Sequence, residues 1–296
     1  MPTLPVEWPP FQGTPIPEQQ HPFIAQLVQR FGGLSRTELA ATLCEQLGWL
    51  RPSGKPKTVE CRQWLESLAE RGLIALPARR AGRPRGSTIA IAALESPPAV
   101  ITDHLSGVAP VTLERVSGAA AQARWRSLVE QYHPLGHRVP FGAQLRYVIA
   151  SPPGVLGGLQ FSSPAWRLRA RDRWIGWEES QRRRGLQHII CNSRFLILPT
   201  VRVPHLASHV LGLAARRIGA DWAHTFGVTP WLLETLVDPA HHHGVSYQAA
   251  NWIPLGLTSG RGRDDRAHAR HGAAPKQVWL YPLRRDARRC LCGVGS

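Results

Sequence analysis

The chain has 296 residues, enough for one large domain or two ordinary ones, and its 43% hydrophobic content excludes a wholly disordered protein. Its 36 Lys and Arg residues against 20 Asp and Glu give a net charge of +16. This charge favours nucleic acid as a partner over an acidic membrane surface, because no basic amphipathic helix or lipidation signal is apparent. The five scattered cysteines lack a CxxC pair and no apolar run could span a bilayer, so we expect a cytoplasmic protein without a disulfide framework, zinc ribbon or membrane span.

The N-terminal part begins with a Pro-rich arm, residues 1–20, which has no signal-peptide pattern. Three helices are expected after it, at about 22–31, 36–50 and 58–72. Ser35 is placed to cap the second helix, and Gly72 to end the third. The spacing of the leucines on the second helix predicts one apolar face.

A basic hairpin is predicted directly after these helices. Residues 73–77 and 89–94 have the character of short strands, and the loop 78–88 between them is rich in arginine. Three helices followed by a strand, a basic loop and a strand is the order of a winged helix, expected over residues 21–93. A plain helical bundle with a hairpin is the alternative. Within the loop, residues 82–86 read GRPRG, the core of an AT-hook, in which Arg83 and Arg85 would enter a narrow minor groove.

A second domain is expected over residues 111–286, after a linker at 94–110 and before a short tail at 287–296. Helices are predicted at 118–133, 203–218 and near 246–252. Strands are predicted at 143–151, 154–161, 194–199, 231–238 and 276–283. This alternation of helices and strands indicates an α/β or α+β fold.

The highest density of arginine lies between Trp166 and Trp174. Alternate positions are basic there, so on a strand they would share one face beside tryptophans that offer stacking surfaces. Such a face suits a nucleic-acid backbone, and a solvated strand face over core tryptophans is the alternative. The arginines concerned are Arg167, Arg169, Arg171 and Arg173.

Several polar residues interrupt apolar elements of the second domain. Glu234 and Asp238 precede a run of three histidines, a pattern that admits a divalent metal, although such a run is more often solvated. Ser246 and Tyr247 have hydroxyls that could attack a phosphodiester, with Glu234 as the base. A tyrosine that merely packs on its helix is the alternative.

These polar residues are expected to converge on one pocket, because burying them is costly unless they pair with each other or with a ligand. In that pocket arginines would hold phosphate and asparagines would orient it. The predicted catalytic residues are Ser246, Tyr247 and Glu234. The predicted nucleic-acid contacts in this part are Asn192, Arg194, Asn251, Trp252, Arg261 and Arg263.

Five motifs stand in a specific order: NSRFLILP at 192–199, VPHLASHVLGLAARRI at 203–218, LLETLVD at 232–238, YQAANW at 247–252 and LGLTSGRGRDD at 255–265. In this order they resemble the Druantia protein A family, over roughly residues 35–286. The resemblance implies a role in anti-phage defence or in mobile elements, and partner proteins from such systems. Relatives often have Cys at the position of Ser246, which argues against an obligatory nucleophile there.

The order of elements in the second domain also resembles the N-acetyltransferase (GNAT-like) fold. Acetyl-CoA rests in that fold on a Gly-rich turn before the long helix, and residues 198–205 contain no glycine, so acetyl-CoA is not expected. The sequence therefore predicts a DNA-binding protein of defence or DNA mobility, with cleavage or rejoining of strands as a hypothesis. The alternatives are an acyltransferase with a DNA-binding domain and a non-enzymatic DNA-binding adaptor.

Overall fold

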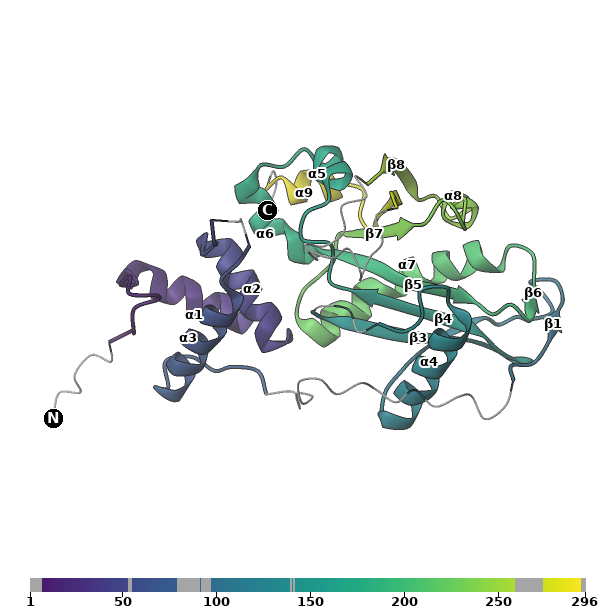
Figure 1. The fold of residues 1–296 in the computed structure, drawn as a ribbon, viewed down its shortest axis with the longest axis horizontal. Coiled ribbons are helices and arrows are strands. Elements are labelled where there is room, and N and C mark those ends of the chain that lie inside the picture. The colour runs from purple at the N-terminus through teal and green to yellow at the C-terminus, as the bar shows by residue number, and fades with distance from the viewer. Residues whose placement is uncertain are drawn as a thin grey trace.

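The structure is a computed structural model that describes residues 7–52, 55–78, 91, 97–138, 140, 142–258 and 274–293. It has a mixed α+β architecture (Figure 1), as the alternation of helices and strands predicts. Three helices lie at one end of the molecule, and a sheet flanked by helices forms the rest. Among the described residues, no helix is long and apolar enough to cross a membrane.

The N-terminal helices are α1 (His21–Arg30), α2 (Arg36–Leu47) and α3 (Thr58–Glu70), preceded by the short 3-10 helix η1 (Glu18–Gln20). The Ser35 hydroxyl accepts a hydrogen bond from the Glu38 amide at 3.2 Å, and α2 ends at Gly48 in the left-handed conformation with φ +70°. Ile24, Leu39 and Leu65 are fully buried between the helices. The three expected helices are therefore confirmed.

Most of the expected basic hairpin lies outside the described residues. Residues 73–78 follow α3 without forming a strand, so the prediction of a strand at 73–77 is wrong. Residues 79–90 and 92–96, which include the GRPRG sequence with Arg83 and Arg85, lie outside the described residues. The winged-helix domain stays a prediction.

A seven-stranded sheet in the order β2-β3-β4-β5-β7-β9-β8 forms the centre of the second part. Only β5 and β7 pair in parallel. The buried residues alternate along β3, which is the pattern of a strand with one face on the core. The strands are β2 (Thr112–Arg115), β3 (Gln144–Ser151), β4 (Gly154–Ser162), β5 (Ile189–Ile197), β7 (Leu232–Val237), β8 (Ile253–Leu257) and β9 (Gln277–Pro282).

Two long helices, α4 (Ala119–Tyr132) and α7 (Leu206–Phe226), pack on the sheet (Figure 1). Tyr147 of β3 donates its hydroxyl hydrogen to Asp221 of α7 at 2.8 Å. Arg146, the preceding residue, stacks its guanidinium 5.0 Å from the Trp125 ring of α4. Because neighbouring residues of a strand point to opposite faces, α4 and α7 cover opposite faces of the sheet.

Shorter elements complete the fold. The strands β1 (Ile101–Thr102) and β6 (Val201–Arg202) form a separate parallel pair, and α8 (Val245–Ala249) connects β7 to β8. Three further helices lie together at the edge of the sheet, namely α5 (Arg169–Ile175), α6 (Glu179–Gly185) and the C-terminal α9 (Ala287–Leu291). The 3-10 helix η2 (Leu186–His188) leads from α6 into β5.

The N-terminal helices are joined to the rest of the chain by a continuous core and by polar contacts. A Cβ at Gly33 would lie 2.5 Å from the Phe226 backbone, so only glycine fits where the N-terminal helices meet α7. Glu38 of α2 accepts hydrogen bonds from the Ala143 amide and the Ser163 hydroxyl. These contacts fix the N-terminal helices against the sheet.

Candidate functional site

The arginine-rich segment folds as a helix, so its alternating arginines do not share one face and the prediction of a basic strand is wrong. Leu168, Arg171 and Ile175 are buried at helical spacing, while Arg169 and Arg173 are exposed. Gly176, with φ +79°, ends α5. The helix therefore buries one arginine and presents its neighbours to solvent.

Arg171 is a structural residue. Its side chain is fully buried, and its guanidinium contacts Glu234 Oε2 and Asp172 Oδ1, each at 2.8 Å. Its pKa is raised, because the attraction of the two carboxylates outweighs burial. Arg171 is therefore not available to nucleic acid, which corrects its assignment as a contact.

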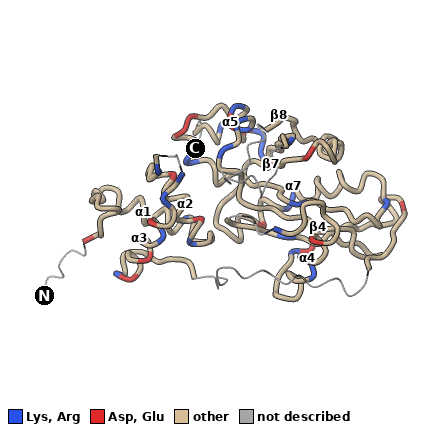
Figure 2. Tube along the Cα trace, viewed as in Figure 1, with Lys and Arg blue, Asp and Glu red and all other residues tan. Residues whose placement is uncertain are grey.

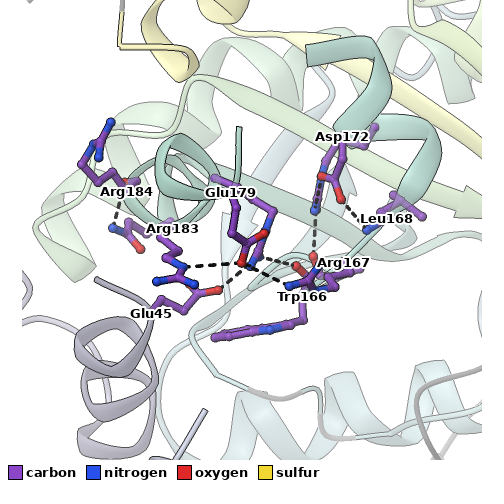
Figure 3. Close-up of polar contacts among 12 residues, drawn as sticks. Glu45, Trp166, Arg167, Leu168, Asp172, Glu179, Arg183 and Arg184 are labelled. Carbon is purple, nitrogen blue, oxygen red and sulfur yellow. Dashed lines mark hydrogen bonds and ion pairs between the residues drawn. The ribbon is translucent and has the colours of Figure 1, made fainter. Parts of the chain in front are cut away.

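Arg182 has the same structural role at the junction with the N-terminal helices. It donates to Glu179 Oε1 at 2.7 Å, to the Trp166 carbonyl at 3.0 Å and to Glu45 Oε1 at 3.2 Å. Figure 3 shows these three partner residues close together. Burial raises the pKa of Glu45 to about 8, although Arg182 opposes this rise. The pKa of Glu179 falls to about 2 because of its hydrogen bonds from Arg182.

The remaining arginines of α5, α6 and α9, together with Arg285 just before α9, form an exposed surface, called here the arginine surface. The three helices pack together: Gln181 donates to the Cys292 carbonyl at 2.5 Å, and Arg288 stacks 5.1 Å from the Trp174 ring. Figure 2 shows basic positions gathered around α5 and near the C-terminal helix. Its exposed arginines without a carboxylate partner among the described residues are Arg169, Arg173, Arg184, Arg285 and Arg288.

Carboxylates compensate this surface only in part. Residues 166–186 hold seven arginines against three acidic residues, and residues 283–293 hold four against one. Arg167, which is 58% exposed, is paired with Glu179 at 3.1 Å. The two segments together therefore carry a net charge of +7, the difference between eleven arginines and four acids. A surface of this kind attracts a polyanion.

Tyr247 and Asn192 meet in the core. The Tyr247 hydroxyl donates to Asn192 Oδ1 at 2.8 Å, and the Thr235 hydroxyl donates to the Asn192 carbonyl at 2.9 Å. Burial raises the pKa of Tyr247. Its ring lies against Trp252, which is 3% exposed. Tyr247 is thus enclosed as a packing residue, and Trp252 offers no face to a nucleic-acid base, which corrects both assignments.

Glu234 is also enclosed, because its two oxygens accept from Arg171 and from the Ala165 amide at 2.8 and 2.7 Å. Glu234 is therefore held as a buried, paired carboxylate, and its role as a general base stays a prediction. Ser246 lies apart from it, half-buried in a pocket of about 200 Å³ between the start of α7 and α8. The three predicted catalytic residues do not form a catalytic group.

A β-bulge separates Arg194 from Asn192. Gln160 of β4 lies opposite Arg194, whereas Phe161 lies opposite Asn192, so Ser193 is the extra residue. Asn192 Nδ2 stabilises the bulge by donating to the Gln160 and Arg194 carbonyls at 3.2 and 3.1 Å. Arg194 consequently points to the α4 face and Asn192 to the opposite face, which contradicts a single pocket. The sequence does not show this bulge.

The other predicted site residues are exposed or lie outside the described residues. Asn251 is exposed and has φ +63°, at the turn between α8 and β8. Arg261 and Arg263 belong to the segment 259–273, which is not described. Asp238 pairs with His241 at 3.2 Å on the surface, and no group of three or more metal-ligating side chains occurs in the described part of the chain.

The fold and this site define a basic α+β protein with a mixed seven-stranded sheet and an exposed arginine surface. The chain belongs to the family described as Druantia protein DruA, which matches residues 91–273, more than half of its length. This confirms the resemblance noted in the sequence, although the N-terminal helices precede the matched range. No curated protein matches the chain.

Several solved acyltransferase structures are similar to the chain. An N-acyl amino acid synthase, FeeM, from uncultured soil microbes is 11% identical, covers 63% of this chain and 98% of its own, and has a TM-score of 0.38. The aminoglycoside acetyltransferase AAC(6')-Ib in complex with coenzyme A and kanamycin is 11% identical, with coverages of 49% and 68% and a TM-score of 0.32. An N-acetyltransferase from Staphylococcus aureus Mu50 is 16% identical, with coverages of 48% and 68% and a TM-score of 0.30.

Proposed function

We propose that this protein binds DNA through its arginine surface and acts in anti-phage defence. The family supports the biological setting, since its description names the Druantia system. The observation that carries DNA binding is the arginine surface, because five of its arginines are exposed and lack carboxylate partners among the described residues. A DNA backbone supplies the missing negative charge, and its binding releases counterions.

The helical form of the segment suits this function better than a strand would. Arg171 and Asp172 hold α5 to Glu234 in the core, so the exposed neighbours Arg169 and Arg173 stand on a fixed support. Arginines on a rigid element lose less conformational freedom on binding phosphate than arginines on a loop. The half-buried Trp174, which Arg288 covers, adds an aromatic ring to the same surface.

The N-terminal part provides a second DNA contact in this proposal. The three confirmed helices fit a helix-turn-helix, and the GRPRG sequence fits A/T-rich minor grooves. Replacing Arg83 and Arg85 with alanine is then expected to weaken binding of A/T-rich duplexes more than of G/C-rich duplexes. Equal losses on both duplexes would show that these residues contribute only general charge.

Recognition of DNA, rather than chemistry on it, is the activity that the described residues support. The enclosed Tyr247 and the paired Glu234 favour an adaptor that brings partner proteins of the defence system to DNA. Strand cleavage through Tyr247 would require it to leave Asn192 and the core.

Acyl transfer is the second candidate, because the pocket of about 200 Å³ beside Ser246 lies where the long helix α7 begins. The sheet order and the single parallel pair β5–β7 agree with the expected GNAT-like arrangement. Beyond that pair, however, hydrogen bonds from Thr235 and Tyr247 hold Asn192. Stabilisation of the protein against heat by acetyl-CoA would support this candidate, and an unchanged melting temperature would remove it.

The proposed function is tested with labelled single-stranded, duplex and branched DNA, using fluorescence anisotropy and gel analysis for cleavage. The variant R169Q/R173Q/R288Q removes three charges from the arginine surface. Its control, R115Q/R124Q/R216Q, removes three exposed arginines from β2, α4 and α7. We expect the first variant to lose at least tenfold in affinity and the control to change little. Equal affinity in the two variants would refute the assignment of the surface.

A further inference from the structure

Arg146 and Arg194 form a second cationic group, on the sheet face covered by α4. In the register of β3, β4 and β5, Arg146 lies opposite Gln160, and Gln160 lies opposite Arg194. Residues directly opposite each other share a face of the sheet, so the two arginines flank Gln160 across about 10 Å. We call Arg146, Gln160 and Arg194 the cross-strand row.

Neutral groups hold both arginines in place. Arg146 donates from Nε to Gln160 Oε1 at 3.0 Å and from Nη2 to Gln144 Oε1 at 2.7 Å. Arg194 donates from Nε to the Gly136 carbonyl at 3.0 Å and from Nη1 to the Ser193 carbonyl at 2.6 Å. Each guanidinium has five N–H donors, so these bonds leave donors free on Nη1 of Arg146 and Nη2 of Arg194.

The carboxylate of Glu130 lies beside this group, where it accepts a hydrogen bond from the His137 amide at 2.6 Å, but it forms no ion pair with either arginine of the row. The buried Arg171 contacts two carboxylates, and Arg182 contacts the Glu179 carboxylate and the carboxyl group of Glu45. Arg146 and Arg194 are half-buried, and neither forms an ion pair within the described part of the chain. Removing cations from water is costly without a counter-charge, so an external anion would stabilise the cross-strand row.

The segment after α4 adds two histidines to the row. His137 lies edge-on to Trp125 with ring centroids 5.9 Å apart, and both its ring nitrogens are buried without a hydrogen-bond partner. The Leu135 amide donates to His133 Nδ1 at 3.1 Å, which leaves Nε2 of a neutral His133 as a donor.

The pKa shifts of these groups have burial as their first cause and neighbouring positive charges as a further cause. The pKa of His137 falls to about 4 because of burial and the charges of Arg146, Arg126 and Arg194. The pKa of His133 also falls to about 4, through burial and Arg194. Burial and Arg126 lower the pKa of Arg146 to about 10. A bound anion would raise each of these pKa values, because it favours the protonated form.

We propose that the cross-strand row and the ring of His137 form a binding site for a compact oxyanion of the phosphate or phosphate-monoester class. Two guanidinium groups can hold separate oxygens of such an ion, and a neutral His137 can donate an N–H to a third. This site faces α4, whereas the arginine surface lies on α5, α6 and α9, so the two bind independently. The phosphate is supplied either by a free small molecule or by the end of a nucleic-acid strand.

The decisive variant is Gln160→Glu. It has nearly the same shape and places a carboxylate between the two arginines, where it occupies them as the external anion would. Thermal unfolding of the full chain is measured in chloride and in inorganic phosphate at matched ionic strength. We expect phosphate at about ten times its Kd to raise the melting temperature of the wild-type protein by about 4 °C. We expect Q160E to melt higher than wild type in chloride and to lose the response to phosphate.

Titration calorimetry with inorganic phosphate provides the affinity for wild type, R194Q and the matched control R173Q, which removes one charge from the arginine surface. We expect at least a tenfold loss in R194Q and no change in R173Q. An unchanged wild-type melting temperature, or an equal phosphate response in wild type and Q160E, would overturn the proposal. Binding of oligonucleotides with and without a 5′-phosphate then distinguishes the two sources of phosphate. If wild type and R173Q bind the phosphorylated oligonucleotide more tightly and Q160E does not, the ligand is the end of a nucleic-acid strand. If wild type binds both oligonucleotides equally, the ligand is a free phosphate compound.

Discussion

Replacing Glu45 with glutamine is expected to stabilise this protein at neutral and alkaline pH. Glu45 is 2% exposed, and its partner Arg182 is already neutralised by Glu179. Burial raises the pKa of Glu45 from 4.5 to about 8, so the folded state binds this proton more tightly than the unfolded state. The contribution of Glu45 to the free energy of unfolding is therefore fully present below pH 4.5 and is lost as the pH rises towards 8.

The size of the effect follows from the shift in pKa. Each pH unit between 4.5 and 8 lowers the free energy of unfolding by about 1.4 kcal/mol. At pH 7 the wild-type protein has therefore lost about 3 kcal/mol of stability. Glutamine keeps the oxygen that accepts from Arg182 but has no charge to bury. We expect the melting temperature of E45Q to exceed that of wild type by roughly 6–12 °C at pH 7, and by little at pH 5.

Thermal unfolding at pH 5, 7 and 9 measures this difference, with Glu179→Gln as the control. The pKa of Glu179 is lowered to about 2 by its hydrogen bonds from Arg182, so its contribution is present at neutral pH and is lost only in acid. E179Q should accordingly melt below wild type at pH 7. If E45Q is instead less stable than wild type at pH 7, then Glu45 is already ionised in the folded protein at that pH and the reasoning is wrong.

Three further substitutions test the enclosed residues by urea unfolding. Tyr247→Phe leaves Asn192 Oδ1 without its 2.8 Å partner and should cost about 1–2 kcal/mol without abolishing DNA binding; complete loss of binding with an intact fold would contradict a packing role. Arg171→Met leaves Glu234 buried and unpaired and should lower the free energy of unfolding by about 3–5 kcal/mol, most of which R171M/E234M should recover. A loss below about 0.5 kcal/mol, the size expected at an exposed residue, would contradict the ion pair. Gly157→Ala would place a Cβ 2.0 Å from the Leu196 carbonyl oxygen and should prevent the pairing of β4 with β5; a native melting curve would contradict the register.

Periodicity predicted most of the sheet and failed at the arginine-rich segment. The alternation in β3 and the apolar runs in β7 and β9 are local signals, and the structure confirms these strands. Residues 167–173 also alternate, but their helix is set by Leu168, Arg171 and Ile175, which bury one face. The spacing of these three and Gly176 at the helix end were the signals for α5.

Long-range pairing explains the errors at the predicted catalytic residues. Glu234 is the single acidic residue of the apolar strand 232–237, and a buried carboxylate requires a cation as its partner. This pattern indicated a structural ion pair for Glu234. The identity of its partner depends on how α5 folds against β7, which no local pattern contains. The bulge that turns Arg194 away from Asn192 is likewise a property of the β4–β5 register, which the sequence of β5 alone does not show.

The central claim, that the arginine surface binds DNA, is tested most directly by the salt dependence of binding. The logarithm of the association constant of wild type for duplex DNA is plotted against the logarithm of salt concentration, with R169Q/R173Q/R288Q and R115Q/R124Q/R216Q beside it. We predict a steep negative slope for wild type, a slope shallower by about 2–3 for the first variant, and a wild-type slope for the second. A flat wild-type plot, or the same change of slope in both variants, would contradict the account.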